Sequence, residues 1–177
     1  MQVTVIATVT AAGGKLPMGW VHKAKTFKKV RQMKIKGDVH SFISAKGWMN
    51  ANIMIQYMNE IVIPYLKGRP GALVMDDYAA HWTDDVIALA DANNIELIRV
   101  PPTTTSQRQP LDLAVFGPFK HIRQRIALET RHTEISVLDN REEAVIRASK
   151  AWELITKKTI QQGWTQACPP LEAILHC

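Results

Sequence analysis

The chain has 177 residues, 46% of them hydrophobic and 21% charged, which indicates a globular domain of ordinary size with its own core. No apolar run approaches the ~20 residues of a membrane-spanning helix. The first residues lack the basic start and cleavage site of a signal peptide. Cys168 and Cys177 form no CxxC motif, which argues against a zinc site or a disulfide scaffold and favours a reducing, intracellular compartment.

The charge is mildly basic and unevenly distributed. A net charge of +6 and an isoelectric point of about 9.4 suit a polyanionic partner without demanding one. One basic cluster surrounds Lys28 and Lys29, within a segment (residues 15–46) that holds a single acid, and a second surrounds Lys120 and Arg123. From charge alone, phosphate-binding surfaces and ordinary solvated faces are about equally good interpretations.

The first half of the chain predicts a hairpin followed by a long helix. Residues 3–10 alternate β-branched side chains and predict a strand, and residues 16–22 follow a Gly-Gly turn as its second arm. Asn50 is the expected N-cap of a helix over residues 51–66. Helical spacing predicts a buried face made of Met54, Met58, Ile61 and Tyr65.

The second half alternates strands and helices, which indicates an α/β architecture with at least one parallel strand pair. Residues 72–75 form a short, unalternating apolar run that predicts a strand buried on both faces. Residues 95–100 predict another strand. Helices are expected after Thr83, after Pro110, and as one continuous helix over residues 141–162.

Two carboxylates fall at positions where α/β proteins bind ligands. Asp76 follows the strand of residues 72–75, and ligands of open α/β sheets bind beyond the carboxyl ends of strands, although a capping aspartate is the commoner explanation. Asp112 lies in the first turn of a predicted helix, where it could simply complement the helix dipole. Together, the two could share divalent cations, because Mg²⁺ needs only one or two carboxylates besides substrate phosphate oxygens. Paired ions of this kind catalyse phosphodiester cleavage.

Other polar residues nearby carry weaker predictions. Asp77 adjoins Asp76, and since neighbouring strand residues point to opposite sides, one of the two is expected to be a bystander. His81 could contact phosphate or metal, although a lone histidine is more often structural. The loop that contains Thr104 and ends at Gln109 can hydrogen-bond a phosphate, as can most polar surface loops.

Two segments carry a resemblance to a known family. Residues 73–81 (Leu-Val-Met-Asp-Asp-Tyr-Ala-Ala-His) resemble the second-aspartate motif of the DDE superfamily endonucleases of the pogo, Tigger and jerky type. Residues 100–112, from Val-Pro-Pro-Thr to Gln-Pro-Leu-Asp, resemble the third-carboxylate motif of these transposases, and residues 115–120 continue it. Residues 5–17 and 151–163 add weaker similarity, so the resemblance covers nearly the whole chain.

The resemblance implies a ribonuclease-H-like fold, in which helices flank a mixed sheet. It implies that Asp76 and Asp112 are catalytic and bind Mg²⁺ or Mn²⁺, that the partner is DNA, and that the protein is nuclear. The residues expected to contact nucleic acid are His81, Thr104, Gln109, Lys120, Arg123, Lys28 and Lys29.

The first carboxylate of the family pattern, which belongs to the central strand, has no counterpart in this sequence. We therefore expect one DDE endonuclease-like domain over residues 1–177, incomplete at its N-terminal end and lacking the first, central strand. Efficient strand cleavage is not expected. Three explanations for the missing strand remain open. The chain is a fragment of a longer reading frame, a decayed copy, or a domain that folds by closing the gap or by oligomerising.

Three functions remain. The chain is a DDE endonuclease domain, a non-catalytic nucleic-acid-binding remnant of a transposase, or an unrelated α/β binding protein. The third requires that two motifs match by chance in the right order and at suitable spacing, so it is the weakest.

Overall fold

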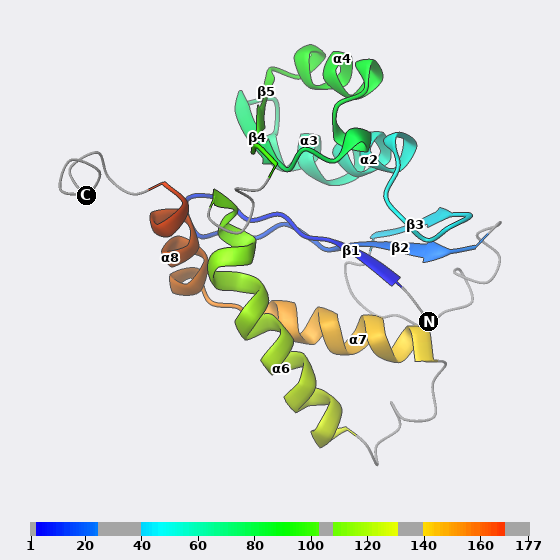
Figure 1. Cartoon of the computed structure of the whole chain (residues 1–177), viewed down its shortest axis with the longest axis vertical. Coiled ribbons are helices and arrows are strands. Elements are labelled where there is room, and N and C mark those ends of the chain that lie inside the picture. The colour runs from blue at the N-terminus through cyan, green and yellow to red at the C-terminus, as the bar shows by residue number, and fades with distance from the viewer. Residues whose placement is uncertain (1–2, 25–39, 103–107, 131–139, 169–177) are drawn as a thin grey trace. The chain divides into compact units, whose positions relative to one another are not determined.

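The computed structural model describes residues 3–24, 40–102, 108–130 and 140–168 (Figure 1). The chain divides into two compact units: residues 1–8 with 16–102, and residues 9–15 with 103–177. We call them the first and the second unit. The architecture mixes α-helices with small β-sheets, as the sequence predicts.

Three strands form one sheet of the first unit. β1 (Val3–Ile6) pairs antiparallel with β2 (Gly19–Lys23), which confirms the predicted hairpin, although β1 is shorter than expected. β2 also pairs in parallel with β3 (His40–Ser44), a strand that the sequence analysis did not predict. The order is β1-β2-β3, so β2 is central, and four of its five residues are buried.

The predicted helix over residues 51–66 forms, with one irregularity. It consists of α2 (Ala51–Tyr57), a π-helical segment (Met58–Val62) and α3 (Ile63–Leu66). The Asn50 side chain accepts a hydrogen bond of 3.0 Å from the Ile53 amide, which confirms the predicted N-cap. Tyr65 was expected on the buried face but is 42% exposed, because the wider π turn changes the phase of the residues after it.

The second sheet of the first unit is a parallel pair. β4 (Gly71–Met75) pairs with β5 (Ile95–Arg99), and α4 (Asp84–Ala92) connects them, which confirms the predicted parallel pair. The prediction that this strand is buried on both faces is wrong, because only Met75 is fully buried. β4 has a single neighbouring strand in the part of the chain that the structure describes, so it receives less cover than the centre of a larger sheet.

Both sheets contribute to one hydrophobic core. Side chains from β2, β3, α2, α4, β4 and β5 belong to the same buried cluster, in which Phe42 and Tyr57 meet edge to face with ring centroids 6.3 Å apart. The Tyr57 hydroxyl lies 2.7 Å from the Thr8 hydroxyl, and burial raises its pKa to about 12. The core therefore fixes β4, whose end carries the first candidate carboxylate.

The second unit is helical. Its described elements are a π-helical segment (Leu111–Val115), α6 (Phe116–Glu129), α7 (Asn140–Glu153) and α8 (Lys157–Ala167). Phe119 of α6 meets Trp152 of α7 edge to face, with ring centroids 6.2 Å apart. None of the described helices is long and apolar enough to span a membrane.

The expectation of one continuous helix over residues 141–162 is wrong, because the chain breaks between α7 and α8. Thr156 starts α8 by accepting a hydrogen bond from the Thr159 amide at 3.2 Å. Lys15 holds the end of α7, since its ammonium group donates to the carbonyl oxygens of Trp152, Glu153 and Ile155. A cation at the C-terminal end of a helix also complements the helix dipole.

Candidate metal and DNA site

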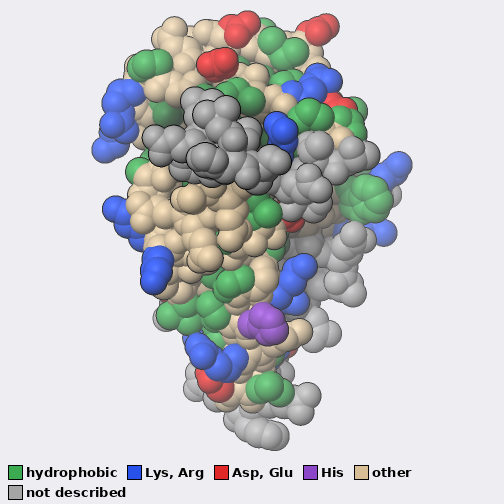
Figure 2. Space-filling model, turned by 60° about the vertical axis from the view of Figure 1, so that its left-hand side comes forward, with side chains coloured by type: hydrophobic (Ala, Val, Ile, Leu, Met, Phe, Trp, Pro, Cys, Tyr) green, Lys and Arg blue, Asp and Glu red, His purple; other side chains and the backbone are tan. Residues whose placement is uncertain are grey.

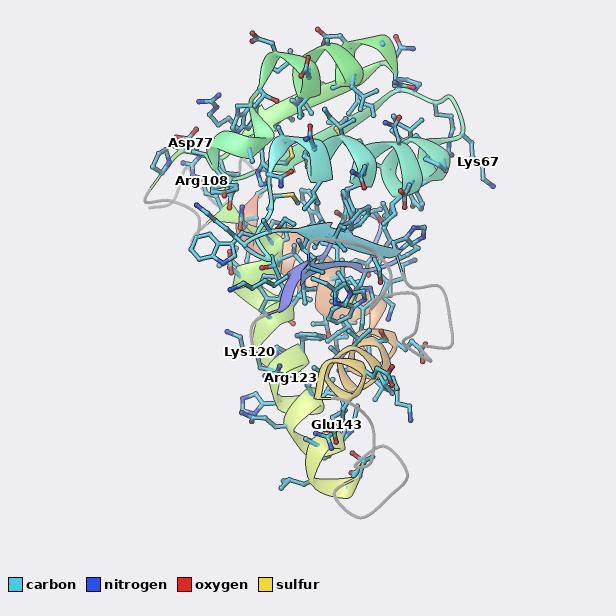
Figure 3. All side chains as sticks on the ribbon, turned by 90° about the vertical axis from the view of Figure 1, so that its right-hand side faces the viewer. Lys67, Asp77, Arg108, Lys120, Arg123 and Glu143 are labelled. Carbon is cyan, nitrogen blue, oxygen red and sulfur yellow. The ribbon has the colours of Figure 1, made fainter. Side chains whose placement is uncertain are left out.

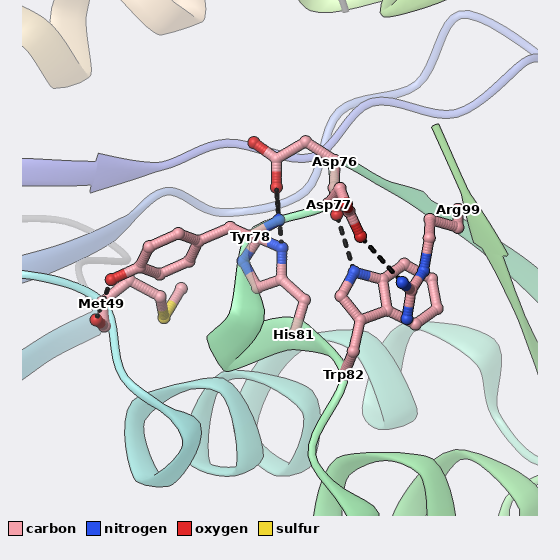
Figure 4. Close-up of polar contacts among 7 residues, drawn as sticks. All are labelled: Met49, Asp76, Asp77, Tyr78, His81, Trp82 and Arg99. Atoms are coloured by element: carbon pink, nitrogen blue, oxygen red, sulfur yellow. Dashed lines mark hydrogen bonds and ion pairs between the residues drawn. The ribbon is translucent and has the colours of Figure 1, made fainter. Parts of the chain in front are cut away.

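Asp76 stands directly after the last residue of β4, at the carboxyl end of the parallel pair. The pairing continues to this point, because the Val100 amide donates to the Met75 carbonyl at 2.8 Å. The Asp76 Oδ1 accepts a hydrogen bond of 3.2 Å from the Tyr78 amide and lies 3.0 Å from the His81 Nδ1 (Figure 4). The side chain is still 41% exposed, so local contacts orient the carboxylate while leaving it open to a ligand.

The local sequence explains why His81 returns to Asp76. The hydrogen bond from Tyr78 makes an Asx-type turn, a preferred local conformation of aspartate. A short 3₁₀ turn (Ala79–His81) follows, in which the His81 amide donates to the Tyr78 carbonyl at 2.9 Å. The indole of Trp82 then donates to the Asp76 carbonyl at 2.8 Å. These three hydrogen bonds close the loop around the aspartate.

Asp77 has a different partner. Its carboxylate lies 2.8 Å from the Arg99 Nη1, and the Arg99 guanidinium stacks over the Trp82 ring at 4.2 Å (Figure 4). This agrees with the expectation that neighbouring strand residues point to different sides. A role for Asp77 as a bystander in chemistry stays a prediction.

Asp112 lies in the second unit, in the first turn of the π-helical segment, and its side chain is exposed. Its amide donates to the Gln109 carbonyl at 3.1 Å, and the Leu113 amide shares that acceptor. π-Helical turns occur often at functional sites. The helix start predicted after Pro110 is confirmed, with Pro110 as its N-cap residue.

A distant glycine packs against the backbone that carries Asp112. Gly163 of α8 approaches so closely that a Cβ there would lie 2.5 Å from the Pro110 carbonyl oxygen and 3.3 Å from the Ala114 Cβ. Only glycine permits this approach without a shift of α8 or of the π-helical segment. The position of Asp112 therefore depends on α8.

Basic side chains extend along α6 from the Asp112 segment. Lys120 and Arg123 are exposed and three residues apart, which places them on neighbouring parts of one helix face (Figure 3). His121 and Arg125 are exposed too, and Arg125 pairs with Glu129 at 3.7 Å. Lys, Arg and His side chains appear in the region of α6 in Figure 2.

The structure places the other predicted site residues as follows. Gln109 supports the Asp112 turn through its carbonyl, and His81 faces Asp76. Lys28, Lys29 and Thr104 lie outside the described residues. Asp76 and Asp112 belong to different units, so a metal shared between them stays a prediction.

The donor types suit a hard cation. Carboxylate oxygens are the ligands that Mg²⁺ prefers, and two of them are enough when substrate phosphate and water complete the shell. Within the described ranges, no group of three or more His, Cys, Asp or Glu side chains is arranged to hold a metal ion.

Sequence analysis did not identify the supporting residues Tyr78, Trp82 and Arg99 or the close contact of Gly163. Arg99 could have been found, because β5 ends beside β4 in a parallel pair and a cation at that end faces Asp77. The Gly163 contact gives no local signal, since a helical glycine is otherwise only unfavourable.

Residues 1–164 match the DDE superfamily endonuclease family, so the chain belongs to that family, and the domain is of transposase origin. The chain is 26% identical over 122 residues to the mouse (Mus musculus) and human (Homo sapiens) proteins named "Pogo transposable element with KRAB domain". The alignment covers 67% of this chain but only 19% of each relative, so the chain spans about a fifth of their length. No solved structure matches. The predicted family resemblance is thus confirmed.

Proposed function

We propose that this domain acts on DNA through the phosphodiester chemistry of DDE endonucleases. The observation that carries the proposal is Asp76, an exposed carboxylate at the end of β4, oriented by Tyr78 and His81 within the segment that matches the family. Asp112 supplies the second carboxylate. Chemically, two such groups suit a reaction in which water or a 3′-hydroxyl attacks a phosphodiester.

Asp76 and Asp112 are the residues that would hold Mg²⁺ or Mn²⁺. A bound divalent ion would supply Lewis-acid activation of the nucleophile and charge stabilisation at phosphorus. The chain's own residues have supporting roles: His81 and the Tyr78 amide orient the Asp76 carboxylate, and the Gln109 carbonyl anchors the turn of Asp112. Metal-assisted phosphodiester cleavage depends on such orientation, because the protein's main contribution is to position the reacting atoms.

A third carboxylate completes the family pattern, and we propose a ribonuclease-H-like sheet in which a further strand carries it. β1 and β4 each pair with one strand in the described structure, so each has an edge that another strand could join. Without that strand, we expect no efficient cleavage by residues 1–177 alone. We propose that residues 1–177 act as one functional domain. We further propose that the protein is located in the nucleus and can form homo-oligomers.

A second candidate function is nucleic-acid binding without catalysis. It is favoured by the exposed Lys120 and Arg123 on α6, with Lys28 and Lys29 as further phosphate contacts. Such binding follows phosphate charge, so it weakens steeply with salt and does not depend on the aspartates. Salt-independent binding would contradict this candidate.

The test is a calorimetric titration with Mn²⁺. We expect the wild-type chain to bind Mn²⁺ and an Asp76→Ala/Asp112→Ala double variant not to bind it. Asp91→Ala, which removes an exposed carboxylate from α4, is the control and should bind normally. Equal binding by the wild-type chain and the double variant would refute a metal site at these aspartates.

A nicking assay on plasmid DNA tests the predicted inactivity of the isolated chain. We expect no efficient nicking with Mn²⁺ by the isolated chain. Nicking that disappears in Asp76→Ala would contradict the predicted inactivity and establish an endonuclease.

A further inference from the structure

Two large aromatic side chains of the first unit are exposed, and one of them, Tyr78, lies two residues after Asp76. Trp48 is 55% exposed and Tyr78 is 44% exposed. Trp48 lies in the loop between β3 and α2, whereas Tyr78 lies in the loop that follows β4. Aromatic rings usually contribute to cores or interfaces, so two exposed rings on connected loops are candidates for contact with a ligand.

Hydrogen bonds tie the two loops together. The Tyr78 hydroxyl donates to the carbonyl of Met49, the residue after Trp48, at 3.2 Å (Figure 4). Ser44 fixes the backbone of Trp48, because its hydroxyl lies 2.9 Å from both the Trp48 amide and the Trp48 carbonyl. The aromatic rings are therefore presented from a fixed backbone, which lowers the entropy lost when they bind a ligand.

Positive charge accompanies the rings. Lys23 and Lys46 are exposed, and Lys23 packs directly against Gly47, where an added Cβ would lie 2.9 Å from the Lys23 Cβ. Residues 40–50 contain no acid. Exposed aromatic rings with neighbouring lysines are the combination by which proteins bind single-stranded nucleic acid: the rings stack on bases, and the cations hold phosphates.

We propose that Trp48 and Tyr78 form a stacking platform for unpaired bases of the DNA strand that binds at Asp76. The inference rests on the proposed function and adds the kind of DNA that the site takes. The Tyr78 amide donates to the Asp76 carboxylate, so a base stacked on the Tyr78 ring would lie on the same loop as the aspartate. Lys23 and Lys46 hold the neighbouring phosphates of the same strand. The platform selects DNA that is opened at the reaction site.

The test compares single-stranded with duplex DNA by fluorescence anisotropy. The probes are a labelled oligothymidylate of about 20 nucleotides and a duplex of similar length. We expect Trp48→Ala and Tyr78→Ala each to weaken binding of the single strand about tenfold and to leave duplex binding unchanged. Tyr78→Phe keeps the ring and should bind the single strand nearly as well as the wild-type chain.

Tyr65→Ala is the matched control, because it removes an exposed tyrosine from α3 of the same unit. Its affinity should equal that of the wild-type chain. The losses caused by Trp48→Ala and Tyr78→Ala should persist at high salt, since stacking is not screened, whereas the effect of Lys46→Ala should shrink. Equal losses for single strand and duplex, or no larger loss than in Tyr65→Ala, would overturn the platform.

The experiments distinguish failure of the stacking platform from failure of the proposed function. A chain that binds Mn²⁺ through its aspartates but shows no dependence on Trp48 or Tyr78 contradicts the platform alone. A chain whose single-strand binding requires both rings but that binds no Mn²⁺ contradicts the metal chemistry and supports the platform.

Discussion

The two units hold their aspartates by different means. In the first unit, Asp76 follows a strand and is contacted by Tyr78, His81 and Trp82, which all lie within six positions of it. In the second unit, Asp112 sits on a π-helical turn whose backbone is packed against Gly163, far along the chain. These contacts of Asp76 come from one continuous stretch of sequence, whereas the Asp112 turn also depends on a helix that is remote in sequence.

The largest expected effect comes from Gly163→Ala. The new Cβ would lie 2.5 Å from the Pro110 carbonyl oxygen, a backbone atom that cannot move aside alone. Overpacking of this kind should lower the free energy of unfolding by about 3 kcal/mol, outweighing the gain in helix propensity of up to about 1 kcal/mol. Urea unfolding of the chain measures the change.

Gly117→Ala is the control for this substitution. Gly117 is exposed on α6, and an added Cβ meets nothing within 4 Å, so the variant should be as stable as the wild type or slightly more stable. If Gly163→Ala behaves like Gly117→Ala, the position of Asp112 does not depend on the contact with α8.

A smaller effect is expected at Tyr57 in the core of the first unit. Burial raises the pKa of Tyr57 from its ordinary value of 10.0 to about 12. The folded state therefore holds the proton more tightly than the unfolded state, and the associated stability is present below pH 10 and is lost as the pH rises from 10 to 12. The loss should approach about 2.7 kcal/mol at high pH, given roughly 1.4 kcal/mol for each of the two pKa units.

Tyr57→Phe isolates that contribution. Near neutral pH it should cost about 1 kcal/mol through loss of the hydrogen bond to Thr8. Between pH 10 and 12 its unfolding free energy should fall less steeply than that of the wild type. Parallel pH profiles would show that Tyr57 ionises equally easily in the folded and the unfolded chain.

The smallest effect should come from Asp77→Asn. The Asp77–Arg99 pair is partly exposed, and pairs of this kind contribute at most about 1 kcal/mol to stability. Because Asp76 has its own contacts, Mn²⁺ binding should be unchanged in Asp77→Asn and lost in Asp76→Asn, as measured by calorimetry. Equal loss of binding in both variants would show that the two neighbouring aspartates act together.

The local sequence was sufficient to predict those structural elements whose stabilising contacts are local. The Asn50 cap, the strand before Asp76 and the helix after Pro110 were predicted, because caps, short apolar runs and proline act through neighbouring residues. The break between α7 and α8 was missed. Lys15 stabilises it from another part of the chain, and no helical pattern reveals such a contact.

The sequence by itself determined the family, the α/β class and the identity of the two candidate aspartates, because the motifs around Asp76 and Asp112 are contiguous. Tertiary structure decided how exposed β4 is, that Asp77 faces Arg99, and why Gly163 must be small. These properties depend on distances between residues that are remote in sequence, and packing alone sets those distances.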